Sequence, residues 1–191
     1  MSGFGILQSL HVMIVDATLN GHQPLAKRDS FGVYQNPSKS IQHALVPIKG
    51  ILISELLTNQ VDFDVQISLA LCLSKLIRIT TLNLAFEDKL MKKAFRVIVS
   101  SFEALPECDG KSYHKRCRIL ESISRVKSYV VLLDIECDTL ILDIFHHLVA
   151  SPKDDNSTMT LTYVESILVG ILTEVDDLLL ECLISILYQS H

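Results

Sequence analysis

Apolar residues recur along this chain at the period of an α-helix, most clearly between Val61 and Thr80. One apolar stripe in this stretch is made of Val65, Leu69, Cys72, Leu73 and Leu76. A second stripe on a neighbouring face is made of Ile67, Ala70, Leu71 and Ile77. Because a helix that is apolar on two faces must be packed from two sides, the pattern predicts an inner-layer helix. We expect Asp62 or Asp64 to cap its first turn.

The same period predicts further amphipathic helices joined by short turns. Their expected ranges are Ser38–Leu57 with a kink or break at Pro47, Glu87–Leu105, Ser112–Asp134 with an end or bend at Ser128, Asp138–Ser151, Thr158–Thr173 and Asp177–Gln189. In the helix that starts at Ser112, the residues expected to face inward are Tyr113, Cys117, Leu120, Ile123, Ser124 and Val126. Residues 1–37 show no sustained period, which predicts a poorly ordered or divergent N-terminal segment.

Pairs of predicted helices recur at a nearly regular interval. They begin near Val61, Ser112 and Thr158, about 46 to 51 residues apart, slightly above the repeat of about 40 to 47 residues in HEAT and armadillo arrays. No alternating strand pattern is present. The sequence therefore predicts an all-α, HEAT/armadillo-like right-handed α-solenoid, with about three helix pairs in residues 38–191. The last helix is too apolar for a terminal repeat, so we expect a piece of a longer array.

Composition and charge narrow the class of protein. Hydrophobic residues make up 49% of the chain, which argues against disorder. A net charge of −5 gives no global electrostatic case for binding nucleic acid. The five cysteines are odd in number and far apart, which favours free buried thiols in a reducing compartment. Neither a basic signal segment nor an apolar run long enough to cross a bilayer is found, so we expect a soluble intracellular protein.

Residues that carry chemistry are sparse. His114 and Cys117 are three residues apart and could share a metal-ligand face, but no second pair accompanies them. The acidic pairs Asp154–Asp155 and Asp176–Asp177 precede predicted helices, where capping explains them without catalysis. Neither a glycine-rich phosphate loop nor a nucleophile elbow is present. The sequence predicts no active site, no cofactor and no metal.

One group of basic residues stands out from the rest of the chain. It comprises Lys111, His114, Lys115, Arg116, Arg118, Arg125 and Lys127. Helical spacing places Lys111, Lys115 and Arg118 on one exposed face, which could contact phosphate or an acidic partner segment. A solvated helix face balanced by Glu121 and Glu136 is the favoured interpretation, because the aromatic platforms of single-strand binding are absent.

Four blocks of sequence resemble one protein family. They are LIRIT at Leu76–Thr80, FRVIVSSFEAL at Phe95–Leu105, RILES at Arg118–Ser122 and YVVLLDIECDTLI at Tyr129–Ile141. From about Asn36 to the C-terminus, the chain resembles a truncated N-terminal HEAT-repeat region of the plant-type sister-chromatid cohesion proteins named for precocious dissociation of sisters. The opening PSKSIQHALVPIKGILISELL is similar to the first helices of that family.

The resemblance implies a nuclear, non-catalytic regulator or scaffold of the cohesin ring. Members of this family are long HEAT solenoids that bind the kleisin subunit and recruit the cohesin release factor. In this way they tune sister-chromatid cohesion and DNA repair through the cell cycle. The implied partners are therefore cohesin subunits and the release factor, with indirect association with chromatin and without a membrane, a cofactor or a small-molecule substrate.

The chain departs from the family at one turn. In the family, the turn after RIT carries alanine, proline, aspartate and tyrosine and is associated with recruitment of the release factor. Here the turn consists of Thr81, Leu82, Asn83, Leu84, Ala85 and Phe86. Both prolines and the acid are gone and only Phe86 matches in kind, so we expect a looser loop and weaker docking. This turn, with Lys111, Lys115 and Arg118, supplies the candidate partner-binding residues.

Three other interpretations stay open. A HEAT-type adaptor in transport or translation would share the fold but have cytoplasmic partners. A small hydrolase or redox protein would use one of the cysteines. A truncated copy with reduced or no function would account for the loss of the prolines from the turn at residues 81–86.

Overall fold

The computed structural model describes residues 47–54, 58–59, 61–80, 87–103, 105, 110–151 and 157–189. The first of these segments is helical over residues 47–52. The remaining helices are α4 (Phe63–Thr80), α5 (Asp88–Ser100), α6 (Gly110–Val126), α7 (Val130–Asp134), α8 (Asp138–Val149), α9 (Thr158–Glu174) and α10 (Asp177–Gln189). The prediction for residues 1–37 lies outside the described residues, as does the first half of the helix expected from Ser38. Within the described segments, no helix is both long and apolar enough to cross a membrane.

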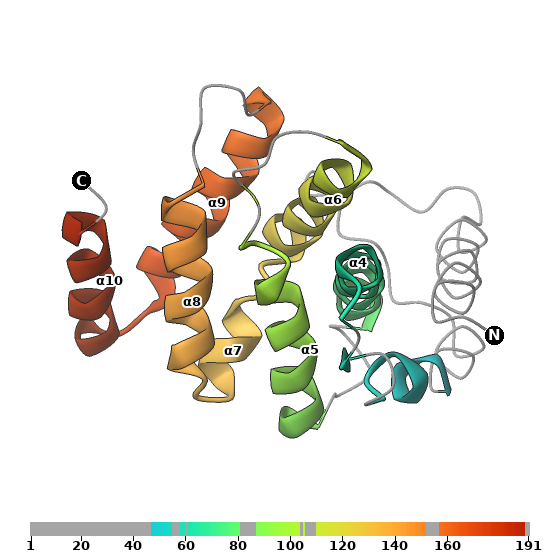
Figure 1. The fold of residues 1–191 in the computed structure, drawn as a ribbon. Coiled ribbons are helices and arrows are strands. Elements are labelled where there is room, and N and C mark those ends of the chain that lie inside the picture. Colours follow the sequence, from blue (N-terminus) through green and yellow to red (C-terminus); the bar gives the residue numbers. More distant parts are fainter. Residues whose placement is uncertain are drawn as a thin grey trace, which may run out of the picture.

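The helices form two adjacent rows (Figure 1). In one row α6 packs between α4 and α9, and in the other α8 packs between α5 and α10. Side-chain contacts within the first row join residues 42 to 48 positions apart in sequence. Tyr113 OH donates to Thr160 Oγ1 at 3.2 Å, over 47 residues, and Ser112 Oγ donates to Asp64 Oδ1 at 2.5 Å, over 48 residues. These separations lie near the predicted helix-pair interval, and the predicted all-α solenoid is confirmed.

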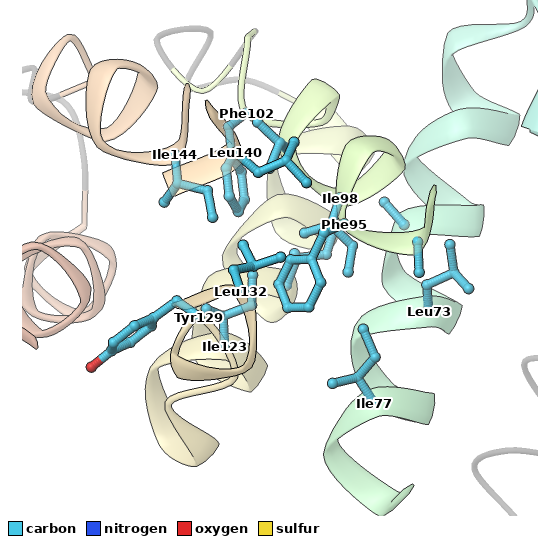
Figure 2. Close-up of a cluster of buried hydrophobic side chains, with 14 of the residues drawn as sticks. Leu73, Ile77, Phe95, Ile98, Phe102, Ile123, Tyr129, Leu132, Leu140 and Ile144 are labelled. Carbon is cyan, nitrogen blue, oxygen red and sulfur yellow. The ribbon is translucent and has the colours of Figure 1, made fainter. Parts of the chain in front are cut away.

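Helix α4 is packed from two sides, as its two apolar stripes predicted. It contacts both α5 and α6, and residues of both stripes are fully buried. Figure 2 shows Leu73 and Ile77 of α4 on one side of Phe95, which belongs to α5. Burying a large apolar side chain stabilises the fold by about 1.5 to 3 kcal/mol, so this shared core holds the two rows together.

Carboxylate and hydroxyl caps fix where several helices begin. Asp62 Oδ1 accepts hydrogen bonds from the backbone amides of Asp64 at 3.0 Å and Val65 at 3.3 Å, so Asp62 caps α4. Asp176 Oδ1 accepts from the amide of Leu179 at 2.8 Å and caps α10. The sequence predicted both acidic caps. It missed the cap of α9, where Ser157 accepts from the Thr160 amide at 3.2 Å.

The helix predicted over Ser112–Asp134 is divided close to the end or bend expected at Ser128. Helix α6 ends at Val126, two residues before Ser128, and α7 forms a separate short helix. Lys127 has a positive φ of 48°, and the Ser128 amide donates to the carbonyl of Ile123 at 3.3 Å. This is the Schellman arrangement that ends many helices, with lysine at the position that glycine usually occupies.

The same arrangement ends α7. Glu136 has a φ of 51°, and the amides of Glu136 and Cys137 donate to the carbonyls of Leu133 and Leu132 at 3.0 and 2.9 Å. The two turns redirect the chain from α6 to α8, which places α8 in the second row. Helix α7 is therefore a connector between the rows.

The inward face predicted for α6 is correct in part. Tyr113, Leu120 and Ile123 are buried, but Cys117, Ser124 and Val126 are only half-buried. The structure buries other residues of this helix instead: Arg116, Ile119 and Ser122. The reason is that α6 packs against α4 on one side and α9 on the other, so its buried surface is wider than a single stripe and rotated from the predicted one.

Candidate protein-interaction surface

Lys115 is placed differently from the prediction of an open, exposed lysine. It is half-buried, and its Nζ donates a hydrogen bond of 2.8 Å to Ser68 Oγ on α4. The ammonium group therefore links the first two helix pairs. A lysine held in this way still contributes positive charge to the surface above α4 and α6, but with less freedom to reach a partner.

Arg118 and Arg125 extend along the exposed side of α6. The side chain of Arg118 is 72% exposed, and its Nη1 lies 3.5 Å from Glu121 Oε2. Arg125 Nη2 lies 2.9 Å from Glu121 Oε1. The predicted balance by Glu121 is confirmed. Lys127 Nζ lies 3.9 Å from Glu174 Oε1. Glu136 lies in the turn after α7, and its role as a second balancing acid stays a prediction.

Helix α4 adds cations to this surface that sequence spacing along α6 did not reveal. Burial lowers the pKa of the Lys75 ammonium, and the nearby charges of Arg118 and Arg78 lower it further. Because the charges of Arg118 and Arg78 act on the pKa of Lys75, these three side chains lie near one another. We call the surface formed by five residues the α4–α6 cationic face: Lys75, Arg78, Lys115, Arg118 and Arg125. These side chains lie together because α4 packs against α6. The hydrogen bond between Lys115 and Ser68, for example, joins residues that are 47 positions apart in sequence.

Arg116 belongs to the interior, although it was grouped with the exposed basic residues. It is only 1% exposed, and its guanidinium carbon lies 6.0 Å from the centroid of the Phe63 ring. An arginine over an aromatic face gains from the ring quadrupole. Arg116 therefore contributes to the packing of α6 against the start of α4 and is not available to a partner.

Two groups of predicted partner-binding residues lie outside what the structure describes. The turn from Thr81 to Phe86 falls between α4 and α5, and the side chain of Lys111 is likewise not described. Of the predicted site, the structure thus places Lys115 and Arg118. The turn follows directly on the last residue of α4, one helical turn beyond Arg78, which puts it next in sequence to the cationic face.

The cysteines do not form a reactive group in the described part of the chain. Cys72 is buried, and burial raises the pKa of its thiol to about 11, so the thiolate is disfavoured at neutral pH. Cys117 Sγ lies 3.2 Å from Thr160 Oγ1, whereas His114 is exposed. Cys182 is exposed, which corrects the prediction of a buried thiol. The described residues include no group of three or more potential ligands that could hold a metal ion.

Successive helix pairs stacked in two rows define an α-solenoid of the HEAT type. A family model described as "Sister chromatid cohesion protein PDS5 protein" matches residues 33–189. The chain belongs to the PDS5 family of sister-chromatid cohesion proteins, which confirms the family resemblance found in the sequence.

Several relatives show how much of a family member the chain represents. It is 38% identical over 157 residues to PDS5 homolog C of Arabidopsis thaliana, and this match covers 82% of the chain but 18% of that protein. It is 34% identical over 155 residues to homolog D of the same plant, covering 81% of the chain and 19% of the relative. The chain thus spans less than a fifth of the length of these relatives.

The fold is also found in a solved structure. The Pds5–Scc1 complex superimposes with a TM-score of 0.70 and 17% sequence identity, covering 95% of this chain and 26% of the matched chain. At this level of identity the likeness establishes the helical-repeat fold.

Proposed function

We propose that the chain is a non-catalytic, cohesin-associated scaffold that acts in the nucleus in sister-chromatid cohesion and DNA repair. The family match over residues 33–189 carries this proposal. The solved complex with Scc1 supports a role in protein binding, because that protein shares the fold. The kleisin subunit and the cohesin release factor are the proposed partners.

The proposed mechanism is capture of an acidic partner segment on the α4–α6 cationic face. Arg118 and Arg125 both approach Glu121, so an incoming carboxylate would compete with one internal acid for two guanidinium groups. Arginine suits this role because its planar group binds a carboxylate in a bidentate manner. Lys115 is held by Ser68 and gives the face a fixed positive charge.

The turn from Thr81 to Phe86 and Lys111 remain part of the proposed binding surface. The turn continues the chain from the end of α4, and Lys111 stands at the start of α6, so both flank the cationic face in sequence. We also propose that the helical array begins near residue 38, after an N-terminal segment that does not contribute to it. Limited proteolysis of the full chain would test that boundary, and cleavage confined to residues above 60 would contradict it.

The function is tested by co-purification. Tagged full-length chain, shown to be helical by circular dichroism, is mixed with recombinant cohesin kleisin and with the release factor. We expect one or both to be retained. If the folded protein retains neither partner, the proposed function is wrong.

The mechanism is tested by a charge reversal with a matched control. Arg118→Glu places a repelling charge on the cationic face, and we expect it to weaken kleisin binding about tenfold, a change of about 1.4 kcal/mol. Arg96→Glu reverses an exposed arginine on α5, outside the face, and should leave binding unchanged. Equal loss in both variants would mean that net charge, not this face, governs binding.

A further inference from the structure

The α4–α6 cationic face carries more positive charge than its internal acid neutralises. Burial is the largest cause of the lowered pKa of Lys75, and the charges of Arg118 and Arg78 each lower this pKa by more than Glu121 raises it. Repulsion between the cations therefore persists in the folded protein, although Glu121 pairs with two of them. A bound anion that relieves this repulsion is favoured.

The face belongs to the side of the helical array and not to one of its ends. Helix α6 is packed along its row by α4 on one side and by α9 on the other. The exposed residues of α6 therefore point away from the stacking direction. Another helix pair added to the array would leave Arg118 and Arg125 open to solvent.

Arg118 and Arg125 converge on one point of this face. They are seven positions apart on α6, which is about 10 Å along the helix axis. Nevertheless, Arg118 Nη1 lies 3.5 Å from Glu121 Oε2, and Arg125 Nη2 lies 2.9 Å from Glu121 Oε1. The two arginine side chains are 72% and 53% exposed, whereas that of Glu121 is 18% exposed. A ligand that approaches from solvent therefore meets both guanidinium groups before it meets the carboxylate.

A phosphorylated side chain fits this arrangement better than a carboxylate does. Glu121 offers one oxygen to each arginine, whereas a guanidinium group carries several N–H donors, so donors remain for an incoming anion. A carboxylate brings a single negative charge, as Glu121 already does. A phosphoserine or phosphothreonine brings a charge of about −1.5 to −2 at neutral pH and more acceptor oxygens. It can bond to both arginines while Glu121 stays in place.

The extent of the face favours a peptide over a nucleic acid. From Lys115 to Arg125 the face covers ten positions of α6, which is about 15 Å. Acids lie on either side of it, since Asp64 at the start of α4 and Glu174 on α9 are both exposed. A nucleic-acid backbone that continued past the face would meet these carboxylates. Residues 157–189 contain no lysine or arginine that could bind its further phosphates.

We propose that the α4–α6 cationic face binds a partner segment that carries a phosphoserine or phosphothreonine, with the phosphate held between Arg118 and Arg125. The inference rests on the proposed function, in which this face takes an acidic segment, and it specifies the acid. Lys75 and Lys115 surround the phosphate with further positive charge. Phosphorylation of the partner therefore strengthens docking at this face.

The probes are short peptides that share one sequence and differ at a central position. This position holds phosphoserine, serine, or a pair of glutamates that matches the charge of the phosphate but not its shape. Binding to the full chain is measured by fluorescence anisotropy. We expect the phosphoserine peptide to bind at least about tenfold more tightly than the serine peptide and about threefold more tightly than the glutamate peptide.

Variants of the chain locate the phosphate. Arg118→Gln and Arg125→Gln should each weaken binding of the phosphoserine peptide about tenfold. Arg118→Lys keeps the charge but loses the planar group, and should weaken it about threefold. Arg96→Gln removes an exposed arginine of α5 outside the face and should leave binding unchanged. Circular dichroism of each variant confirms that the fold is kept.

Three results would overturn the proposal. Equal binding of the phosphoserine and glutamate peptides would show that the face responds to charge alone. Unchanged binding in both Arg118→Gln and Arg125→Gln would place the phosphate elsewhere. Tighter binding of a DNA duplex than of the phosphoserine peptide, lost in Arg118→Gln, would assign the face to nucleic acid.

The peptide measurements use no cohesin subunit, so the two proposals fail separately. If the chain retains unphosphorylated kleisin but does not distinguish the peptides, the proposed function stands and the phosphate inference is wrong. If the peptides behave as expected but neither kleisin nor the release factor is retained, the face binds phosphorylated segments and the proposed function is wrong.

Discussion

The first and last helix pairs differ in how their two helices meet. Helices α4 and α5 pack closely on each other, whereas α9 and α10 each pack on α8 and make little contact with each other. The exposed side of the first region carries the α4–α6 cationic face, while the last region is acidic and exposes apolar side chains. One repeat geometry therefore supports surfaces of opposite chemistry, because the outer positions of each helix are free to vary without disturbing the core.

The largest effect that tests this comparison concerns two phenylalanines. Phe95 in α5 and Phe145 in α8 are both fully buried, but Phe145 also lines a groove of about 360 Å³ that runs along α9. Each change to alanine should cost about 3 to 5 kcal/mol of unfolding free energy. We expect the cost of Phe95→Ala to lie at the upper end of this range, because the change leaves a closed cavity. The cost of Phe145→Ala should lie at the lower end, because its cavity joins the groove.

Urea denaturation of the two variants measures these costs. Tyr188→Ala provides the control, because Tyr188 is 82% exposed and its loss should change stability by no more than about 0.5 kcal/mol. A larger cost for Phe145→Ala than for Phe95→Ala would show that the groove is closed to solvent in solution.

An intermediate effect is expected where the last pair meets the preceding turn. A Cβ at Gly170 of α9 would lie only 1.8 Å from the hydroxyl oxygen of Tyr129, whose ring is buried. Gly170→Ala should therefore cost about 1 to 3 kcal/mol through overpacking. Gly50→Ala is the matched control, because nothing lies within 4 Å of its Cβ position. Thermal unfolding of the two variants gives the comparison.

Adding Tyr129→Phe to Gly170→Ala separates a local clash from other causes. The change removes the hydroxyl, which has no hydrogen-bond partner among the described residues, but leaves a ring carbon 2.8 Å from the new Cβ. Partial recovery of stability is expected. No recovery would mean that the alanine acts elsewhere in α9.

The smallest effect tests the cationic face through Lys75. Its pKa in the folded protein is lowered from 10.5, chiefly by burial. Below the folded-state pKa, the charged lysine destabilises the folded state relative to the unfolded chain, and this cost disappears as the pH rises from that pKa to 10.5. Lys75→Met should therefore stabilise the protein at pH 7 by up to about 0.5 kcal/mol, and the gain should fade toward alkaline pH.

Melting temperatures of the wild type and Lys75→Met at several pH values measure this difference. Lys89→Met, on the exposed side of α5, controls for loss of a surface charge. A difference between wild type and Lys75→Met that stays constant from neutral to alkaline pH would show that the pKa of Lys75 is not lowered in the folded protein.

Periodicity was sufficient to predict the helices that have clear apolar stripes and acidic caps. Helix α10 begins at Asp177 and ends at Gln189, as expected, and α4 is packed on two sides. The breaks on either side of α7 were also placed closely: α6 ends two residues before the break expected at Ser128, and α7 ends at Asp134 as expected. What the sequence did not reveal is the left-handed conformation of Lys127 and Glu136, a position that glycine usually occupies.

The candidate site was only partly predictable for a related reason. Helical spacing correctly predicted that Arg118 is exposed, but the position of Lys115 depends on its hydrogen bond to Ser68 in the preceding pair. Lys75 and Arg78 were missed because they come from α4, and the burial of Arg116 depends on Phe63. The opening between α9 and α10 likewise depends on how each helix meets α8. The apolar period of a single helix does not reveal such contacts between helices.

The stacking of successive helix pairs along the first row has a consequence for how the chain unfolds. Among the described helices, every substantial contact joins elements of the same pair or of adjacent pairs. Each helix pair is therefore stabilised mainly by its direct neighbours, and unfolding spreads from one pair to the next along the array. A destabilising change near α10 therefore affects α4 only after the helix pair between them has unfolded.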